Sequence, residues 1–213
     1  MLKNAKGIFA FLLLFSVSVS AYSEVKPAIN GGINLIGVAG GDGDGGVLIP
    51  SVTGFFDLFL YPFSGSLHDK FGIAWGIGFY YAQVSPTNMG HESYYSNDET
   101  FSSIMMPMYA AFKYNFKSGE KVNPFIRADI GGFWWWPDER LITSNTGASD
   151  WDWWTGFYTS LSGGADIGNH LTLGAKLSNL PCCFSYTYYN MGRHTYEREI
   201  DMIFLSVYAG YRF

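Results

Sequence analysis

The final segment of the chain, residues 203–213, alternates strictly between two kinds of side chain. Every second position is apolar: Ile203, Leu205, Val207, Ala209, Tyr211 and Phe213. The positions between them hold a smaller and more polar set: Phe204, Ser206, Tyr208, Gly210 and Arg212. A period of two residues indicates a β-strand, because successive side chains of a strand point to opposite faces. The segment therefore predicts a strand with one wholly apolar face that ends on an aromatic residue.

Such a strand is typical of a closed barrel in a lipid bilayer. Hydrocarbon cannot hydrogen-bond to a free strand edge, so the closing strand must pair with the first strand and present one apolar face to lipid. The segment resembles the C-terminal signal of bacterial outer-membrane β-barrels, with Phe213 as the terminal aromatic residue and Tyr211 two positions before it. The resemblance implies that the barrel-assembly machinery recognises this strand.

The first residues have the pattern of a secretory signal peptide. Lys3 and Lys6 form a short positive region, 7–19 is apolar, and 21–23 carries small residues at the positions that a signal peptidase reads. We expect cleavage before Glu24. The alternative, a membrane anchor, needs an apolar run of about 20 residues, and no Cys stands at the cleavage site to suggest a lipoprotein. The predicted regions are a signal peptide at 1–23 and a transmembrane barrel domain at 24–213.

Composition agrees with a barrel and excludes other classes. Aromatic residues make up 19% of the chain and charged residues 15%, with 26 glycines. Beyond the first segment no apolar run reaches the about 18 residues of a spanning helix. The net charge of −5 becomes −7 when Lys3 and Lys6 are removed, which argues against nucleic-acid binding, because that requires clustered positive charge.

Eight alternating segments follow the predicted cleavage site. They span 28–38, 47–63, 71–84, 101–116, 122–136, 152–167, 171–188 and 200–213. Short breaks at 64–70, 117–121 and 168–170 alternate with longer breaks at 39–46, 85–100, 137–150 and 190–199. Outer-membrane barrels have short periplasmic turns and long extracellular loops. The sequence thus predicts an all-β fold, an eight-stranded antiparallel up-and-down transmembrane β-barrel with both termini in the periplasm.

Aromatic residues gather at the two expected rims. One predicted belt flanks the third long break: Trp134, Trp135, Trp136, Trp151, Trp153 and Trp154. The opposite belt comprises Tyr61, Phe63, Phe71, Tyr114, Phe116, Phe125, Tyr211 and Phe213. Tryptophan and tyrosine favour the membrane–water boundary, where the ring is apolar and the polar atom stays hydrated. The alternative is a soluble barrel with a Trp-rich ligand pocket.

The inward register carries charge. When the apolar set faces lipid, five charged residues point inside: Asp57, Arg127, Asp129, Asp166 and Lys176. An eight-stranded barrel leaves an interior that side chains just fill, so opposite charges can pair there. We expect a salt-bridged and mostly plugged lumen. A narrow ion path through these charges is the alternative interpretation.

The middle of the chain resembles a known hairpin. Segment 106–116 carries a Pro followed by an alternating apolar strand, and 123–132 begins with a Pro–Phe pair and ends in Gly–Gly. This arrangement is similar to the OmpA-like and opacity-type β-barrel superfamily. The resemblance implies an outer-membrane location, contact with lipid and lipopolysaccharide, and a monomer. Because the sequence ends on the predicted last strand, we expect it to be closer to the single-barrel members than to those with a peptidoglycan-binding domain.

Candidate chemistry is sparse, and we expect no cofactor and no metal site. Barrel enzymes that modify lipid A carry Ser, His and acidic groups, so His91 with Glu92 or His194 with Glu197 is conceivable. None of these residues lies in a motif of such enzymes.

Two further motifs leave alternatives open. Segment 40–46 alternates Gly and Asp, which suggests either a calcium turn or a flexible loop. Cys182 and Cys183 could form a vicinal disulfide, join another chain or stay reduced. Pro181 cannot donate to a β-ladder, so we expect a bulge or the end of regular pairing there.

These patterns predict a structural or surface-recognition role through the long extracellular loops, with an unidentified ligand. An OmpW-type channel for hydrophobic solutes is the alternative, and a lipid-A enzyme is a third and weaker hypothesis.

Overall fold

A computed structural model describes residues 24–41, 44–62, 70–84, 101–117, 120–137, 154–189 and 193–213. The predicted signal peptide, 1–23, lies outside them. The described residues form eight strands: β1 Glu24–Gly41, β2 Asp44–Tyr61, β3 Phe71–Val84, β4 Phe101–Asn115, β5 Val122–Pro137, β6 Trp154–Ile167, β7 Leu171–Tyr189 and β8 Arg193–Arg212. Within this part of the chain, no helix has the length and apolarity to cross a bilayer.

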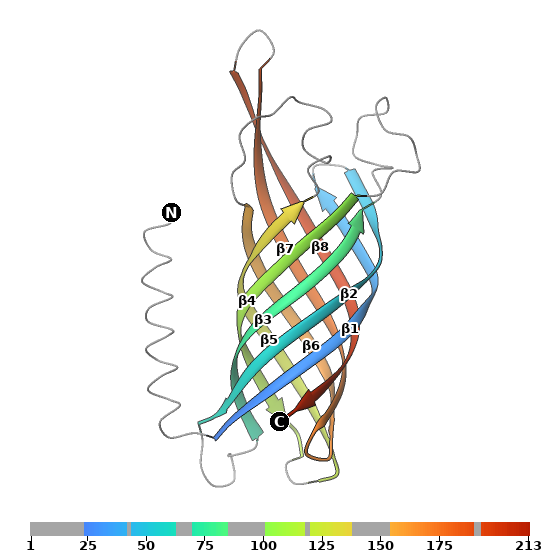
Figure 1. The fold of residues 1–213 in the computed structure, drawn as a ribbon, viewed down its shortest axis with the longest axis vertical. Coiled ribbons are helices and arrows are strands. Elements are labelled where there is room, and N and C mark those ends of the chain that lie inside the picture. Colours follow the sequence, from blue (N-terminus) through green and yellow to red (C-terminus); the bar gives the residue numbers. More distant parts are fainter. Residues whose placement is uncertain are drawn as a thin grey trace.

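The strands close into a barrel in which each pairs antiparallel with the next and β1 pairs with β8 (Figure 1). The predicted fold class is therefore confirmed. At the seam, Ile29 of β1 lies opposite Tyr211 of β8, and the Phe213 amide donates to the Pro27 carbonyl at 2.9 Å. We call the end that carries the β2–β3, β4–β5 and β6–β7 connections the short-turn end; the C-terminus lies there (Figure 1).

The two faces of the wall are inverted relative to a water-soluble protein. On β8 the apolar set Ile203, Leu205 and Val207 is exposed on the outside, whereas Ser206 between them is fully buried. The same alternation runs along β3, β4, β5 and β7. An apolar exterior around an interior that takes up the charged residues is the arrangement that a bilayer requires of a spanning barrel.

One irregularity interrupts the alternation in β1. Its pairing with β8 shifts register between Asn34 and Ile36, and both Leu35 and Ile36 are exposed on the outer face. A bulge inserts one extra residue and increases the local twist. It thus lets Asn34 stay inside while two consecutive apolar residues stay outside.

β7 and β8 extend beyond the rest of the barrel at the end opposite the short turns (Figure 1). Their pairing runs unbroken to Tyr189 opposite Arg193. β6 last pairs with β7 at Cys182, and β1 last pairs with β8 at Asp201. Among the described residues, the distal parts of β7 and β8 therefore pair only with each other, and we call these two segments, 183–189 and 193–200, the ribbon.

The ribbon changes two predictions. The segment 190–199, predicted as a loop, is mostly strand, because β8 begins at Arg193. We predicted a bulge or the end of regular pairing at Pro181. On the side of β8 this is wrong, because the register continues through Pro181 opposite Asp201. Pairing is interrupted instead toward β6, between Asn179 and Cys182. Because proline has no N–H to donate, an interruption on one side accounts for its missing hydrogen bond.

Candidate functional site

The interior of the barrel holds the candidate site. The structure buries all five charged residues that the alternation assigned to the lumen: Asp57, Arg127, Asp129, Asp166 and Lys176. They come from β2, β5, β6 and β7, and each occupies an inward position of its strand. Four of the five lie in one cluster, and Asp166 lies in a second cluster nearer the short-turn end.

Arg127 is the centre of the first cluster. Its two terminal nitrogens lie 2.7 and 2.8 Å from the two carboxylate oxygens of Asp57, and its Nε lies 2.6 Å from Asp129 Oδ1. Lys176 Nζ lies 2.9 Å from the other oxygen of Asp129. The paired contact between Arg127 and Asp57 is the strongest geometry for a guanidinium and a carboxylate. Two cations and two carboxylates thus neutralise one another away from water.

Neutral donors complete this cluster. The Tyr109 hydroxyl and the Asn30 side-chain amide each donate to Asp57 at 3.0 Å. The Ser160 hydroxyl donates to Asp129 at 2.6 Å. Each oxygen of both carboxylates therefore accepts at least one hydrogen bond. Burying a charge is costly unless its hydrogen bonds are satisfied, and this network meets that condition.

The second cluster surrounds Asp166. Lys113 Nζ donates to both of its oxygens at 2.8 and 2.7 Å. Arg212 donates to one oxygen at 3.0 Å and the Thr172 hydroxyl to the other at 2.9 Å. Lys113 and Arg212 were not among the five charged residues predicted for the lumen. The signal was present, because both occupy the polar register of strands whose other register is wholly apolar.

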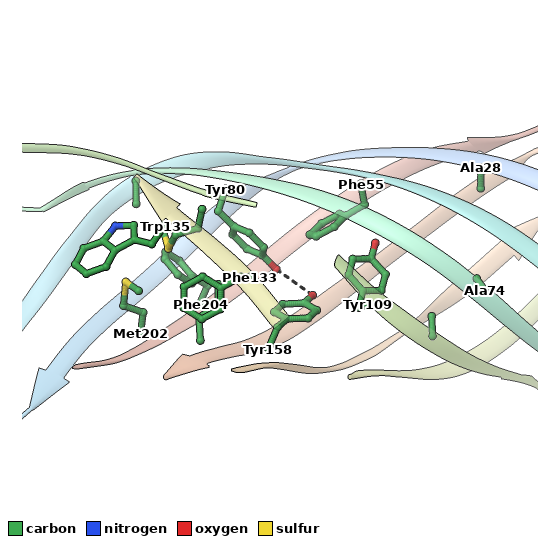
Figure 2. Packing of buried hydrophobic residues seen from close by; sticks show 14 of the residues in the cluster. Ala28, Phe55, Ala74, Tyr80, Tyr109, Phe133, Trp135, Tyr158, Met202 and Phe204 are labelled. Atoms are coloured by element: carbon green, nitrogen blue, oxygen red, sulfur yellow. Dashed lines mark hydrogen bonds between the residues drawn. The ribbon is translucent and has the colours of Figure 1, made fainter. Parts of the chain in front are cut away.

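An aromatic and apolar layer packs inside the barrel around Tyr80 and Tyr158 (Figure 2). The Tyr80 hydroxyl lies 3.4 Å from that of Tyr158 and 2.7 Å from Ser178 Oγ. Further buried members of this layer are Met105, Phe133, Leu180, Met202 and Phe204. Together with the two charge clusters, this layer makes three groups of buried side chains inside the barrel.

The described residues of the predicted Trp belt lie on both faces of the barrel wall. Trp134 and Trp136 are 38% and 37% exposed on the outer face, whereas Trp135 is 8% exposed and belongs to the interior cluster. The prediction for Trp135 is therefore corrected. Its physical reason is parity, since Trp135 shares the register of Arg127 and Asp129 on β5. The remaining predicted members lie outside the described side chains: Trp151, Trp153 and Trp154.

The aromatic belt predicted at the short-turn end also has members on both faces of the wall. Tyr211 and Phe213 are exposed on the outside, with Tyr211 stacked on His170 at 5.2 Å between ring centroids. Phe71, Tyr114 and Phe116 also lie on the outer register, and Phe63 is outside the described residues. Tyr61 and Phe125 are buried inside instead. They share the inward register of Asp57 and Arg127, respectively.

The residues considered for lipid-A chemistry cannot be placed as a site. His91 and Glu92 lie outside the described residues. His194 and Glu197 are positions of β8, opposite Tyr188 and Ser185 of β7, with side chains outside the description. The same holds for the side chains of 40–46 and of Cys182 and Cys183.

Comparison with known proteins supplies the context for this geometry. No family model matches the chain, and neither does any curated protein. Solved structures do match. The outer membrane protein OprG from Pseudomonas aeruginosa aligns with a TM-score of 0.52 at 11% identity over 90% of this chain and 97% of its own. The outer membrane protein AlkL, solved in lipid bilayers, aligns with a TM-score of 0.53 at 16% identity, covering 90% and 92%.

The chain has the fold of the eight-stranded outer-membrane β-barrels. At these identities the likeness concerns the fold.

Proposed function

We propose that this chain spans the bacterial outer membrane as a closed barrel and acts as a structural or surface-recognition protein. Its apolar exterior contacts lipid and lipopolysaccharide, and its short-turn end faces the periplasm. The ribbon and the long connections then stand outside the cell. Support comes from the loop asymmetry, from the inverted faces of the wall and from the extension of β7 and β8 beyond the other strands.

The observation that carries the proposal is the filled lumen. Lys113 with Asp166, the Arg127 cluster and the Tyr80–Phe133 layer follow one another along the axis. Each layer joins strands that are not neighbours in the wall: β4 with β6, β5 with β2, and β3 with β7. An eight-stranded barrel has little room beyond its own side chains, so an axial route for solutes would require displacing these layers. The ribbon is then the feature through which the protein meets its surroundings.

We expect the purified barrel to give no stable current steps in planar bilayers, because buried ion pairs and aromatic rings block the axis. The measurement is single-channel recording at several voltages, with a protein-free bilayer as baseline and a general porin as positive control. An uptake assay for hydrophobic solutes in cells with and without the gene accompanies it. Reproducible current or gene-dependent uptake would favour the OmpW-type channel instead.

Surface labelling tests the orientation. In a background with Cys182 and Cys183 changed to Ser, we expect single cysteines in the ribbon to react with a membrane-impermeant maleimide on intact cells. Cysteines placed in the short turns, for instance at Gly168 or Asn169, should react only after the cells are lysed. Labelling of the short turns on intact cells would reverse the orientation and remove the surface role of the ribbon.

A further inference from the structure

The seam between β1 and β8 is the one place in the wall where the paired strands are not consecutive in the chain. Connections of a few residues join β1 to β2 and β7 to β8, and the length of such a connection fixes the register of the hairpin that it closes. The seam has no connection of this kind. Its register therefore has to be specified by the side chains of the two strands.

The outer face of the seam does not specify that register. Its pairs are apolar or small: Ile29 with Tyr211, Gly31 with Ala209, Ile33 with Val207, and Ile36 with Leu205. A slip by one residue would turn the apolar set inward, so the alternation excludes it. A slip by two residues keeps every apolar side chain outside. The alternation thus allows more than one way of closing the barrel.

The inner face of the seam sets large side chains against small ones. The described inward pairs are Ala28 with Arg212, Asn30 with Gly210, Gly32 with Tyr208, Asn34 with Ser206, and Gly37 with Phe204. In every pair except Asn34 with Ser206, one member is glycine or alanine and the other is larger. The interior of an eight-stranded barrel is just filled by its side chains, so each large residue uses the space that its small partner leaves. We call these five the seam pairs.

The fit is tightest at Gly32 and Tyr208. A Cβ atom added at Gly32 would lie 2.8 Å from Tyr208 Cβ and closer still to the Val207 carbonyl oxygen. Neither atom moves unless strand β8 moves. At Gly31, the next residue and on the outer face, an added Cβ would meet no such atom within 4 Å. The inner face therefore requires glycine at 32, whereas the outer face leaves room at 31.

Asn30 and Gly210 form the same kind of pair with the large residue on β1. A Cβ atom added at Gly210 would lie 2.7 Å from Asn30 Cγ, so the Asn30 side chain occupies the space above the glycine. From there its amide donates to Asp57 at 3.0 Å. The absence of a side chain at 210 thus lets β1 contribute to the Arg127 cluster.

The pair of Asn34 and Ser206 is polar, and both residues are buried. The Ser206 hydroxyl donates to Asn34 Oδ1 at 2.5 Å, and Asn34 Nδ2 donates to Ser51 Oγ of β2 at 2.8 Å. A buried polar group without its partner costs free energy. A change of register at the seam would separate Asn34 from Ser206 and leave both in an interior that offers them no water.

Slips by two residues have different consequences on this inner face. In one direction Asn30 would lie opposite Tyr208, where two large side chains compete for one space. In the other direction Gly32 would lie opposite Gly210, and the large side chains would no longer fill the space between the strands. The inner face therefore distinguishes registers that the outer face treats as equal.

We propose that the seam pairs are a conformational device that selects the single register in which the barrel closes. β8 has several offsets against β1 that keep the apolar set outside. One of them matches large to small along the lumen and satisfies Asn34 and Ser206. Because strand register sets the stagger and the diameter of a barrel, the same selection brings the strands of the Arg127 cluster to one height. The proposal does not depend on the role proposed for the ribbon.

Disulfide cross-linking in the refolded barrel reports the register directly. In a background with both native cysteines changed to Ser, Ile33→Cys with Val207→Cys lies directly opposite in the observed register. Gly31→Cys with Val207→Cys, and Ile33→Cys with Ala209→Cys, become opposite only after a slip by two. Opposite residues lie about 4.5–5.5 Å apart, whereas diagonal neighbours at about 7–8 Å are too far for a disulfide. With the seam pairs intact, we expect only the first combination to cross-link.

The double variant Asn34→Ala with Tyr208→Ala weakens the seam pairs. We expect it to cross-link in the slipped combinations as well. The matched control, Ile36→Ala with Tyr211→Ala, removes a ring and a medium-sized side chain from the outer face of the same two strands, and it should cross-link in the observed register alone. Cross-links confined to the observed register in the first variant, or slipped cross-links in both variants, overturn the proposal.

A reciprocal exchange covers the case in which the first double variant does not fold. Asn30→Gly leaves a void, Gly210→Asn overfills the same space, and the two changes together restore one large and one small member. The measurement is the folded yield after dilution from urea into lipid vesicles. Each single change should lower the yield, and the exchange should recover much of it. Gly32→Ala should also lower the yield and Gly31→Ala should not. An exchange that folds no better than the worse single variant contradicts the role of the seam pairs.

Discussion

Asp57→Ala is expected to lower the free energy of unfolding of the barrel by about 3–5 kcal/mol, the range for breaking a buried ion pair from one side. The substitution removes the carboxylate that holds two nitrogens of Arg127. Tyr109 and Asn30 lose their acceptor in the same step. The guanidinium then remains inside with Asp129 as its carboxylate partner, far from bulk water. The measurement is urea unfolding in lipid vesicles, followed by tryptophan fluorescence.

Two companion variants separate the loss of a partner from the loss of packing. Asp57→Leu combined with Arg127→Met removes both charges and keeps apolar volume, and we expect it to recover much of the stability, as replaced buried pairs often do. Lys117→Gln breaks only an exposed contact with Glu120, which is worth about 1 kcal/mol at most. If Asp57→Ala costs no more than Lys117→Gln, the Arg127 cluster does not stabilise the barrel.

Ile130→Arg is expected to cost about 2–4 kcal/mol, the range for arginine on the lipid face at the midplane of a barrel. Ile130 is exposed on the outer face of β5, opposite Ala110 of β4 and Thr159 of β6. It lies midway along the wall between Ile126, opposite Tyr114, and Trp134. Of its two cross-strand neighbours, Ala110 is apolar and Thr159 offers a hydroxyl but no charge, so the guanidinium must reach along the wall to the headgroups. Unfolding in vesicles of defined lipid composition gives the free energy.

Phe116→Arg supplies the matched control for this prediction. Phe116 is exposed at the short-turn end, just beyond β4, where the same substitution costs about 0–1 kcal/mol. Both variants lose an apolar side chain, so the difference between their free energies of unfolding reports the depth of the arginine in the bilayer. Equal costs at the two positions would mean that this face of β5 does not contact hydrocarbon.

Much of the fold follows from periodicity, and the exceptions have physical causes. β3 has the predicted bounds, and β4, β5 and β6 differ from them by one or two residues at an end, because apolar and small residues alternate there without interruption. The early part of β8 was not predicted. Between Tyr189 and Ile200 the sequence is polar with Gly192 and Asn190, which is typical of a loop. Strand pairing with β7 overrides that local composition.

The sequence predicted which charged residues of the candidate site lie inside the barrel. It did not predict which of them contact one another. Alternation alone places Asp57, Arg127 and Lys176 inside. It cannot tell which of them meet, because contacts across the lumen depend on how strand tilt and stagger bring β2 and β5 to one height. The errors at Trp135 and Phe125 have another origin. Residue type suggested a membrane belt for both, whereas their parity with Arg127 already indicated the interior.

The seam between β1 and β8 has a consequence for biogenesis. β8, the partner of the first strand, is synthesised after the seven other strands, so no chain that lacks it can hold a continuous wall. Until that segment arrives, two rows of amide and carbonyl groups are open and able to pair with any other extended polypeptide. A cell that makes this protein must therefore keep this unfinished apolar sheet apart from other polypeptides during transit, and the pairing of β8 with β1 ends that hazard.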